Sequence, residues 1–413
     1  MSLQTKTPVQ TASDNEYEPQ LWKFVPLSEY QLPAGMSLSR ATMKQWSMLK
    51  GLFRSNKDEL QVPAKAESEL RSMPQARLEN LAPPVDWKSA VAALDVALTP
   101  WLKTLPEGKN VQFVIGQPFF GHQDILTAWA NKNNAAVINA PPRHELLKPD
   151  PCELSLKDKG TELWVMPSLE QFFLRHASGL DVVRRLLEQA ASGHLGAGLI
   201  GCDSWAWEYL KRIWPFPVKS AFTLQSFDGD QLTRYFAGNV SSTEKYLFCH
   251  AKTGECILPS ADTLSSGDYE VNQELKQLAL HCRGNLGTAW SYWRNRLRSV
   301  PEADHAGSNV TTEEQKTHSK IWISSDLVEP DMPLDGAEDI ALVLHALLIH
   351  NGLSADLLAA ILPLSTSHVF SILLRLQAAE LICCREETWQ VVPLGYATVR
   401  RFLVARGYLA DSF

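Results

Sequence analysis

The stretch Val111-Gln-Phe-Val-Ile115-Gly116-Gln-Pro-Phe-Phe-Gly121-His122-Gln123 decides how the rest of the chain is interpreted. Its first five residues predict a short apolar strand, and apolar residues at helical spacing follow from about His122. A strand, then Gly-x-x-x-x-Gly, then a helix is the geometry of a phosphate-binding loop. Two glycines at this spacing also occur by chance, so a strand-to-helix turn without a ligand is the alternative.

The side chains of this loop differ from those that phosphate chemistry uses. A phosphate loop needs a lysine that reaches the β- and γ-phosphates and a Ser or Thr hydroxyl that binds Mg²⁺. His122 occupies the lysine position and Gln123 the hydroxyl position. Histidine is only partly charged at neutral pH, and Pro118 removes a backbone N–H from the cradle. Phe119 and Phe120 put large rings where phosphates normally approach.

Short apolar segments alternate with helical patterns on the carboxyl side of the loop. Further strands are expected at 135–139, 163–166 and 197–201, and further helices at 87–103, 169–174, 180–191 and 205–213. Strands of this length that alternate with helices predict a parallel sheet covered on both faces. We therefore expect an α/β domain as the centre of the protein.

Composition shifts and prolines suggest how the chain is divided. We expect an irregular and helical N-terminal arm over 1–84 (with a helix near 39–53), the α/β domain over 85–225, a helical lid over 226–300, a linker over 301–333 and a final unit over 334–413. The final unit combines three helices, a two-stranded ribbon around Arg385-Glu-Glu and a last helix. That order is the winged-helix pattern.

The order of these segments resembles the AAA+ / P-loop ATPase family, especially bacterial members with a C-terminal winged helix. The resemblance covers roughly 85–413. Leu163–Met166 is similar to the family's Walker B strand, Ala197–Gly201 to its sensor-1 strand, and 280–298 to its sensor-2 helix. The resemblance implies a P-loop NTPase-type parallel sheet with a helical lid. It also implies nucleotide binding, of ATP or ADP without a firm Mg²⁺ requirement, at Gly116, Gly121, His122, Gln123, Asp203 and Ser204.

Four functional groups of that family are missing together. Besides the loop lysine and hydroxyl, the acidic pair after the Walker B strand is replaced by Pro167-Ser168, and Gly287 stands at the sensor arginine's position. Glu170 is the nearest carboxylate and the one candidate for a displaced base, although we expect it on the surface of the following helix. Phosphoryl transfer depends on positioning and electrostatic stabilisation by such groups, so their joint loss argues against hydrolysis.

The expected recognition helix of the winged helix is poorly suited to DNA. Its candidate contacts, to DNA or to a partner, are Ser367, His368, Ser371 and Arg375. Residues 334–413 carry five arginines, no lysine and eight acidic residues, whereas DNA-binding modules normally present a basic face. We therefore favour contact with a protein partner or another copy of the chain over contact with nucleic acid.

Composition excludes several classes of protein. The chain has 413 residues, is 45% hydrophobic and carries a formal charge of −7. No apolar run approaches the ~18 residues that a membrane span needs, and the polar N-terminus lacks the apolar stretch that is typical of a signal peptide. The seven cysteines include no Cys-x-x-Cys pair, so we expect a reduced cytoplasmic protein without a metal site.

Three hypotheses follow from these residues. The first is a non-catalytic AAA+-like protein that acts as a scaffold or regulator and assembles with itself or with a true ATPase. The second is a divergent active ATPase whose missing groups come from elsewhere. The third is a DNA-binding accessory protein that uses the winged helix.

Overall fold

A computed structural model gives the fold of the protein. It describes residues 21–34, 63–104, 111–148, 163–193, 195–214, 221–239, 246–300, 319–324, 327–333 and 335–413. The helix expected near 39–53 and most of the expected linker over 301–333 lie outside the described residues.

The central sheet has six strands, and all but one neighbouring pair are parallel. Its order is β1 (Phe24–Pro26), β7 (Ala221–Leu224), β3 (Val111–Gly116), β6 (Ala197–Asp203), β5 (Leu163–Met166) and β4 (Ala136–Val137). β1 alone runs antiparallel, against β7. The expected mixed α/β architecture with a mostly parallel sheet is therefore confirmed.

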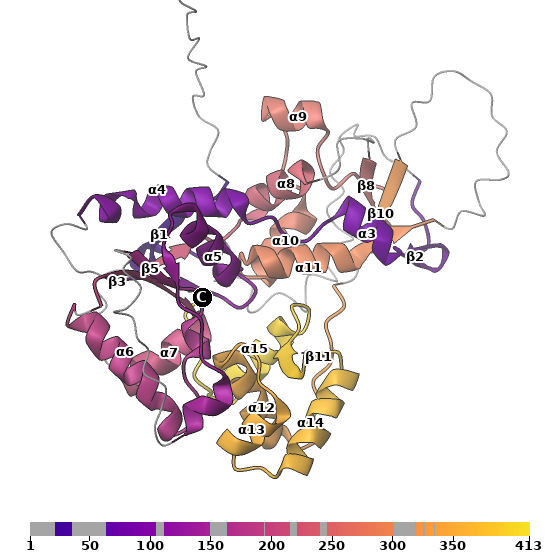
Figure 1. Ribbon diagram of the computed structural model, residues 1–413. Helices are drawn as coiled ribbons and strands as arrows, with labels where there is room; N and C mark the ends of the chain where they lie inside the picture. Colours follow the sequence, from indigo (N-terminus) through magenta and orange to yellow (C-terminus); the bar gives the residue numbers. More distant parts are fainter. Residues whose placement is uncertain are drawn as a thin grey trace, which may run out of the picture.

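Helices cover both faces of this sheet (Figure 1). α4 (Lys88–Thr104) and α5 (His122–Lys132) lie on one face, and α6 (Asp181–Ala191) and α7 (Ser204–Ile213) lie on the other. Alternate residues of β3 point to opposite faces: Val114 packs in the core beneath α4 and α5, and Ile115 packs in the core beneath α7.

One expected helix is absent. Residues 169–174 form only a single 3₁₀ turn, η5 (Leu169–Gln171), before the chain continues without regular structure. Leu169, Phe172, Phe173 and Leu174 are all buried, at 0–1% exposure. A surface helix would leave one face in water, so a segment whose apolar side chains are all buried runs through the core instead.

A second sheet lies beside the helices that follow the central sheet. Those helices are α8 (Gly229–Gly238), α9 (Ala261–Ser266), α10 (Gln273–His281) and α11 (Leu286–Arg296). The sheet has the order β2 (Arg71–Ser72), β9 (Leu297–Ser299), β10 (Ser319–Ile323) and β8 (Tyr246–His250). The region expected to be a helical lid thus also contributes strands, and one further strand comes from the segment just before α3 (Gln75–Leu81).

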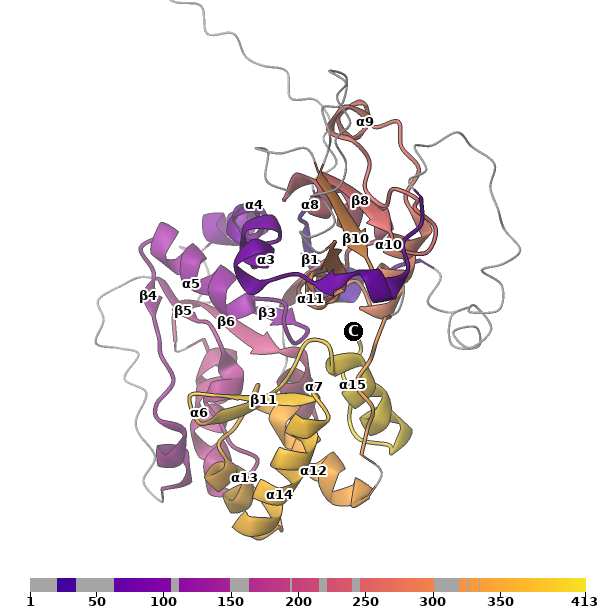
Figure 2. The ribbon, with the colours of Figure 1, turned by 90° about the vertical axis from the view of Figure 1, so that its right-hand side faces the viewer.

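The last part of the chain packs around a hydrophobic cluster that also includes Leu146, Leu174, Val182 and Trp205 of the α/β part. It contains α12 (Ala337–Ile349), α13 (Ala355–Ile361), α14 (Thr366–Ala378), the hairpin of β11 (Ile382–Arg385) and β12 (Thr388–Val391), and α15 (Tyr396–Ala405). Ser365 caps α14 by accepting a hydrogen bond from the His368 N–H. These elements match the expected order, and the winged-helix assignment stays a prediction. Figure 2 shows this unit below the central sheet, with the marked C end between the two.

Candidate functional site

The loop after β3 is filled by its own side chains. A Cβ atom at Gly116 would lie 1.9 Å from Cδ1 of Phe120, so the Phe120 ring takes the space above this glycine. Gly121 has a φ of 72°, which favours glycine, and a Cβ there would lie 2.3 Å from Cε2 of Trp87. Both glycines therefore allow aromatic rings, and not an anion, to approach the backbone.

α11 and the residue before it hold the loop from the other side. Nδ2 of Asn285 donates a hydrogen bond of 2.7 Å to the Pro118 carbonyl. A Cβ atom at Gly287 would lie 2.0 Å from the carbonyl oxygen of Phe119. The position where the family resemblance leads one to look for an arginine therefore has no room for any side chain.

His122 and Glu170 form a buried pair beside the loop. Nε2 of His122 lies 3.0 Å from Oε1 of Glu170, and the two residues are 4% and 0% exposed. The expectation that Glu170 lies on a helix surface is wrong, because the apolar residues around it carry it into the core. Burial by itself raises the pKa of Glu170, but the His122 charge and the hydrogen bonds outweigh it, so the pKa is below its usual value.

Asp203 and Ser204 stand at the end of β6, next to the loop. Gly116 and Asp203 are paired in the parallel register of β3 and β6. The Asp203 N–H donates to Oε2 of Glu170 at 3.0 Å, and Oδ1 of Asp203 accepts from the Trp205 N–H and caps α7. Burial, followed by the Glu170 charge, holds the pKa of Asp203 well above its usual range.

The structure brings most of the expected nucleotide-binding residues to one edge of the sheet. Gly116, His122, Asp203 and Ser204 lie there with Glu170, whereas Gln123 is exposed on α5 and takes no part in the cluster. The sequence places Gln123 at the position of a Mg²⁺ ligand. Its side chain instead faces solvent, since Gln123 is turned about 100° around the helix from the buried His122.

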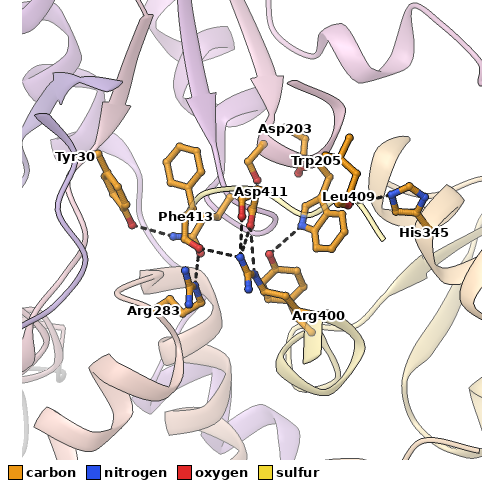
Figure 3. Close-up of polar contacts among 12 residues, drawn as sticks. Tyr30, Asp203, Trp205, Arg283, His345, Arg400, Leu409, Asp411 and Phe413 are labelled. Carbon is orange, nitrogen blue, oxygen red and sulfur yellow. Dashed lines mark hydrogen bonds and ion pairs between the residues drawn. The ribbon is translucent and has the colours of Figure 1, made fainter. Parts of the chain in front are cut away.

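Residues near the end of the sequence complete this edge, and sequence reasoning missed them (Figure 3). Oδ1 of Asp411 accepts from the Arg400 NH2 group at 2.8 Å, and Oδ2 accepts from Oγ of Ser204 at 2.5 Å. The Arg283 Nε–H donates to the Phe413 carbonyl at 2.6 Å. These residues come from separate segments without a shared motif, so no local signal joins them.

Among the described residues, a small crevice lies between the loop and α11. Its lining includes Tyr30, Gln117, Ser226, Asn285 and Phe413. Its volume of about 20 Å³ holds roughly one water molecule, while pockets for drug-sized ligands usually measure ~300–1,000 Å³. This crevice, as the described residues form it, has no room for a nucleotide.

The expected recognition helix, α14, uses part of its polar face within its own unit. Nε2 of His368 lies 2.9 Å from Oδ2 of Asp339, and the Arg375 NH2 group donates to the Asp335 carbonyl at 2.8 Å. Ser367 and Ser371 are exposed. Two apolar side chains of the same helix also face solvent, Phe370 at 48% exposure and Leu374 at 47%.

Neither a metal site nor a membrane span is found in the described ranges. Within them, no group of three or more His, Cys, Asp and Glu side chains is placed to hold a metal ion. No helix in the same ranges is both long enough and apolar enough to cross a membrane.

Comparison with known proteins finds similarity among solved structures. No family model matches the chain, and no curated protein matches it. Among solved structures, the Walker-type ATPase PABY2304 of Pyrococcus abyssi aligns with 83% of this chain and 99% of its own, at 11% sequence identity and a TM-score of 0.30. Because this TM-score is low, no function is inferred from the alignment, and function is inferred from the residues described above.

Proposed function

We propose that this protein is a non-catalytic, AAA+-like protein that acts as a scaffold or regulator. One observation carries the proposal: the Phe120 ring fills the space above Gly116, where a phosphate would have to lie in a working loop. A ring in this position blocks the backbone N–H groups that hold an anion at a strand-to-helix turn. The loop keeps the geometry of a phosphate site without the space for one.

The position of the loop in the sheet supports a P-loop ancestry. From β3 the chain passes to β4, β5 and β6 on one side, and then to β7 on the other side of β3. Ligands of open parallel sheets bind outside the carboxyl ends of the strands, at the point where the strand order reverses. Gly116 ends β3 at this point, so a degenerate loop here fits a former ligand site.

The groups nearest to a catalytic role are engaged with each other. Both oxygens of Glu170 have a partner. Oε1 pairs with His122, and Oε2 accepts a hydrogen bond from the Asp203 N–H. A general base must be within reach of the proton that it removes, and a carboxylate with no exposed surface reaches no water from the solvent. The pair therefore supports a structural role and disfavours the divergent active ATPase.

The use of the C-terminal unit for DNA binding is also disfavoured. Arg375 is the permanent cation among the candidate contacts, and it is bonded to the Asp335 carbonyl of its own unit. Phe370 and Leu374 are exposed on the same helix, and apolar surface of this kind is more typical of protein contacts. We propose a protein partner or a second copy of the chain as the binding partner.

The experiment that tests the proposal is phosphate release from Mg·ATP by the full-length protein. We expect no release above the protein-free rate, and no difference between the wild type and His122→Gln, which replaces the imidazole of the loop. Isothermal titration with ATP and with ADP, with and without Mg²⁺, measures binding separately. Turnover by the wild type that His122→Gln abolishes would show an active ATPase and end the scaffold proposal.

A further inference from the structure

Residues 409–413 lie at the edge of the central sheet as an extended segment outside any helix or strand (Figure 3). Leu409 and Ala410 are partly buried, and over the last three residues burial alternates: Asp411 is 5% exposed, Ser412 faces solvent and Phe413 is 3% exposed. This period of two is the pattern of an extended peptide that one surface recognises through every second residue.

The Asp411 carboxylate occupies a site made by two separate elements. Arg400 of α15 reaches Oδ1 with its NH2 group at 2.8 Å and its Nε at 3.2 Å, and Ser204 at the start of α7 reaches Oδ2. Hydrogen bonds between a guanidinium and a carboxylate are among the strong ones in proteins. The site therefore selects for a negative charge at this position of the segment.

The site contacts Phe413 through both its ring and its main chain. The ring lies 4.8 Å, centroid to centroid, from the ring of Tyr30, which comes from the far N-terminal part of the chain. The Phe413 carbonyl accepts from Nε of Arg283 at 2.6 Å and from the Arg400 NH2 group at 3.1 Å. Together with the Asp411 contacts, these bonds recognise an acidic residue followed, two positions later, by an aromatic one.

We propose that this edge of the sheet is a peptide-binding site with the chain's own residues 409–413 as resident ligand, and that it accepts the same Asp-x-Phe sequence from a second copy of the chain. The inference rests on the proposed function, because it requires that the edge no longer holds a nucleotide. The contacts explain why such an exchange is feasible. Apart from the bonds to Arg400, the polar contacts of the segment are with side chains of other segments, and a second copy's segment offers the same groups.

In one chain, the segment competes strongly for its own site. A tethered ligand has an effective concentration in the millimolar range, so a free peptide at micromolar concentration does not displace it. Exchange between copies therefore becomes measurable when the resident segment is weakened. This property defines the experiment.

The test measures the fluorescence anisotropy of a labelled peptide that carries residues 406–413 and ends in an amide. The amide keeps the carbonyl that Arg283 and Arg400 contact and adds no new charge. The full-length double variant Asp411→Asn with Phe413→Ala is expected to bind this peptide at least tenfold more tightly than the wild type does. Ser412→Ala, at the exposed position of the same segment, is the matched control and should behave as the wild type.

Two further arms assign the binding to the site. A peptide with Asn in place of Asp411 should bind the double variant at least tenfold more weakly, and adding Arg400→Gln to the double variant should abolish binding. If the folded double variant, checked by circular dichroism, binds the peptide no better than the wild type, the proposal is overturned. Peptide binding that neither the Asn peptide nor Arg400→Gln weakens also overturns the proposal.

A measurement on the wild type covers the case in which the double variant does not fold. Hydrogen–deuterium exchange of residues 409–413 should be faster than exchange of β3 and β6, because an exchangeable segment leaves its site without global unfolding. Exchange as slow as in those strands contradicts the proposal.

Failure of the proposed function is recognised by a different result, which is Mg·ATP turnover by the wild type. Should ATP displace the peptide from the double variant without turnover, the site is a nucleotide site and the peptide proposal fails alone.

Discussion

At the scale of single residues, Gly287 packs directly against the main chain of the loop after β3. We predict that Gly287→Arg, which introduces the arginine that the family resemblance implies, destabilises the protein by about 1–3 kcal/mol, because any side chain there meets the Phe119 carbonyl. Urea unfolding measures the loss. Gly238→Arg is the matched control, since a Cβ atom at Gly238 has nothing within 4 Å. Equal stability of the two variants would contradict the packing argument.

The pair of His122 and Glu170 makes a second prediction at this scale. His122→Ala leaves the Glu170 carboxylate buried without the imidazole that contacts it, so we expect a loss of about 3–5 kcal/mol in unfolding free energy. His122→Ala combined with Glu170→Gln should lose clearly less than the sum of the two single changes. Strict additivity in this double-mutant cycle, measured by urea unfolding, would mean that the two side chains do not interact.

The buried position of Glu170 is the least accessible to sequence reasoning. A glutamate within Leu169-Glu-Gln-Phe-Phe-Leu174 suggests a helix with a polar face, and local periodicity has no means of finding a partner 48 positions away. The same limit applies to Arg283 and Phe413, which are separated by 130 positions. Residues whose role is set by one distant contact are not visible in the spacing of their neighbours.

At the scale of elements, Arg375 distinguishes a structural role for α14 from a DNA-reading one. We predict that Arg375→Ala lowers the stability of the protein by about 1 kcal/mol, because it removes the hydrogen bond to the Asp335 carbonyl near the start of α12. Thermal unfolding measures this, with Arg385→Ala at the exposed tip of the hairpin as the matched control. Binding to duplex DNA that weakens steeply with salt and disappears in Arg375→Ala would instead favour the DNA hypothesis.

Elements with a strong local pattern are predictable from the sequence, and those defined by pairing are not. Helical spacing predicts α5 and α6 and an apolar run predicts β6, and each is found within a few residues of its expected bounds. β1 and β2 are only three and two residues long, and each becomes a strand only because a partner far along the chain is next to it. Such strands carry too few residues for a period of two to appear.

At the scale of the whole molecule, two buried histidines lie where the C-terminal unit meets the α/β part. Nδ1 of His345 lies 3.2 Å from the Arg175 NH1 group, and Nε2 of His350 accepts from the Arg175 N–H. Burial, together with the Arg175 charge, lowers the pKa of His345 to about 4. Burial and the charges of Arg143 and Arg175 hold the pKa of His350 well below its usual range. Both side chains are therefore neutral in the folded protein at pH 7.

This arrangement predicts that acid lowers the unfolding free energy of the protein by protonating the histidines at this contact. In the unfolded chain His345 takes up a proton near the ordinary histidine pKa of 6.5, so below that pH the unfolded state binds more protons and stability falls as pH drops toward 4. From pH 7 to pH 5 we expect His345 alone to account for about 2 kcal/mol of the loss in unfolding free energy. Urea unfolding at each pH measures it as the difference between the wild type and His345→Gln. His368→Gln, at an exposed histidine of the same unit, is the control, and a His345→Gln curve that runs parallel to the wild type would refute the assignment.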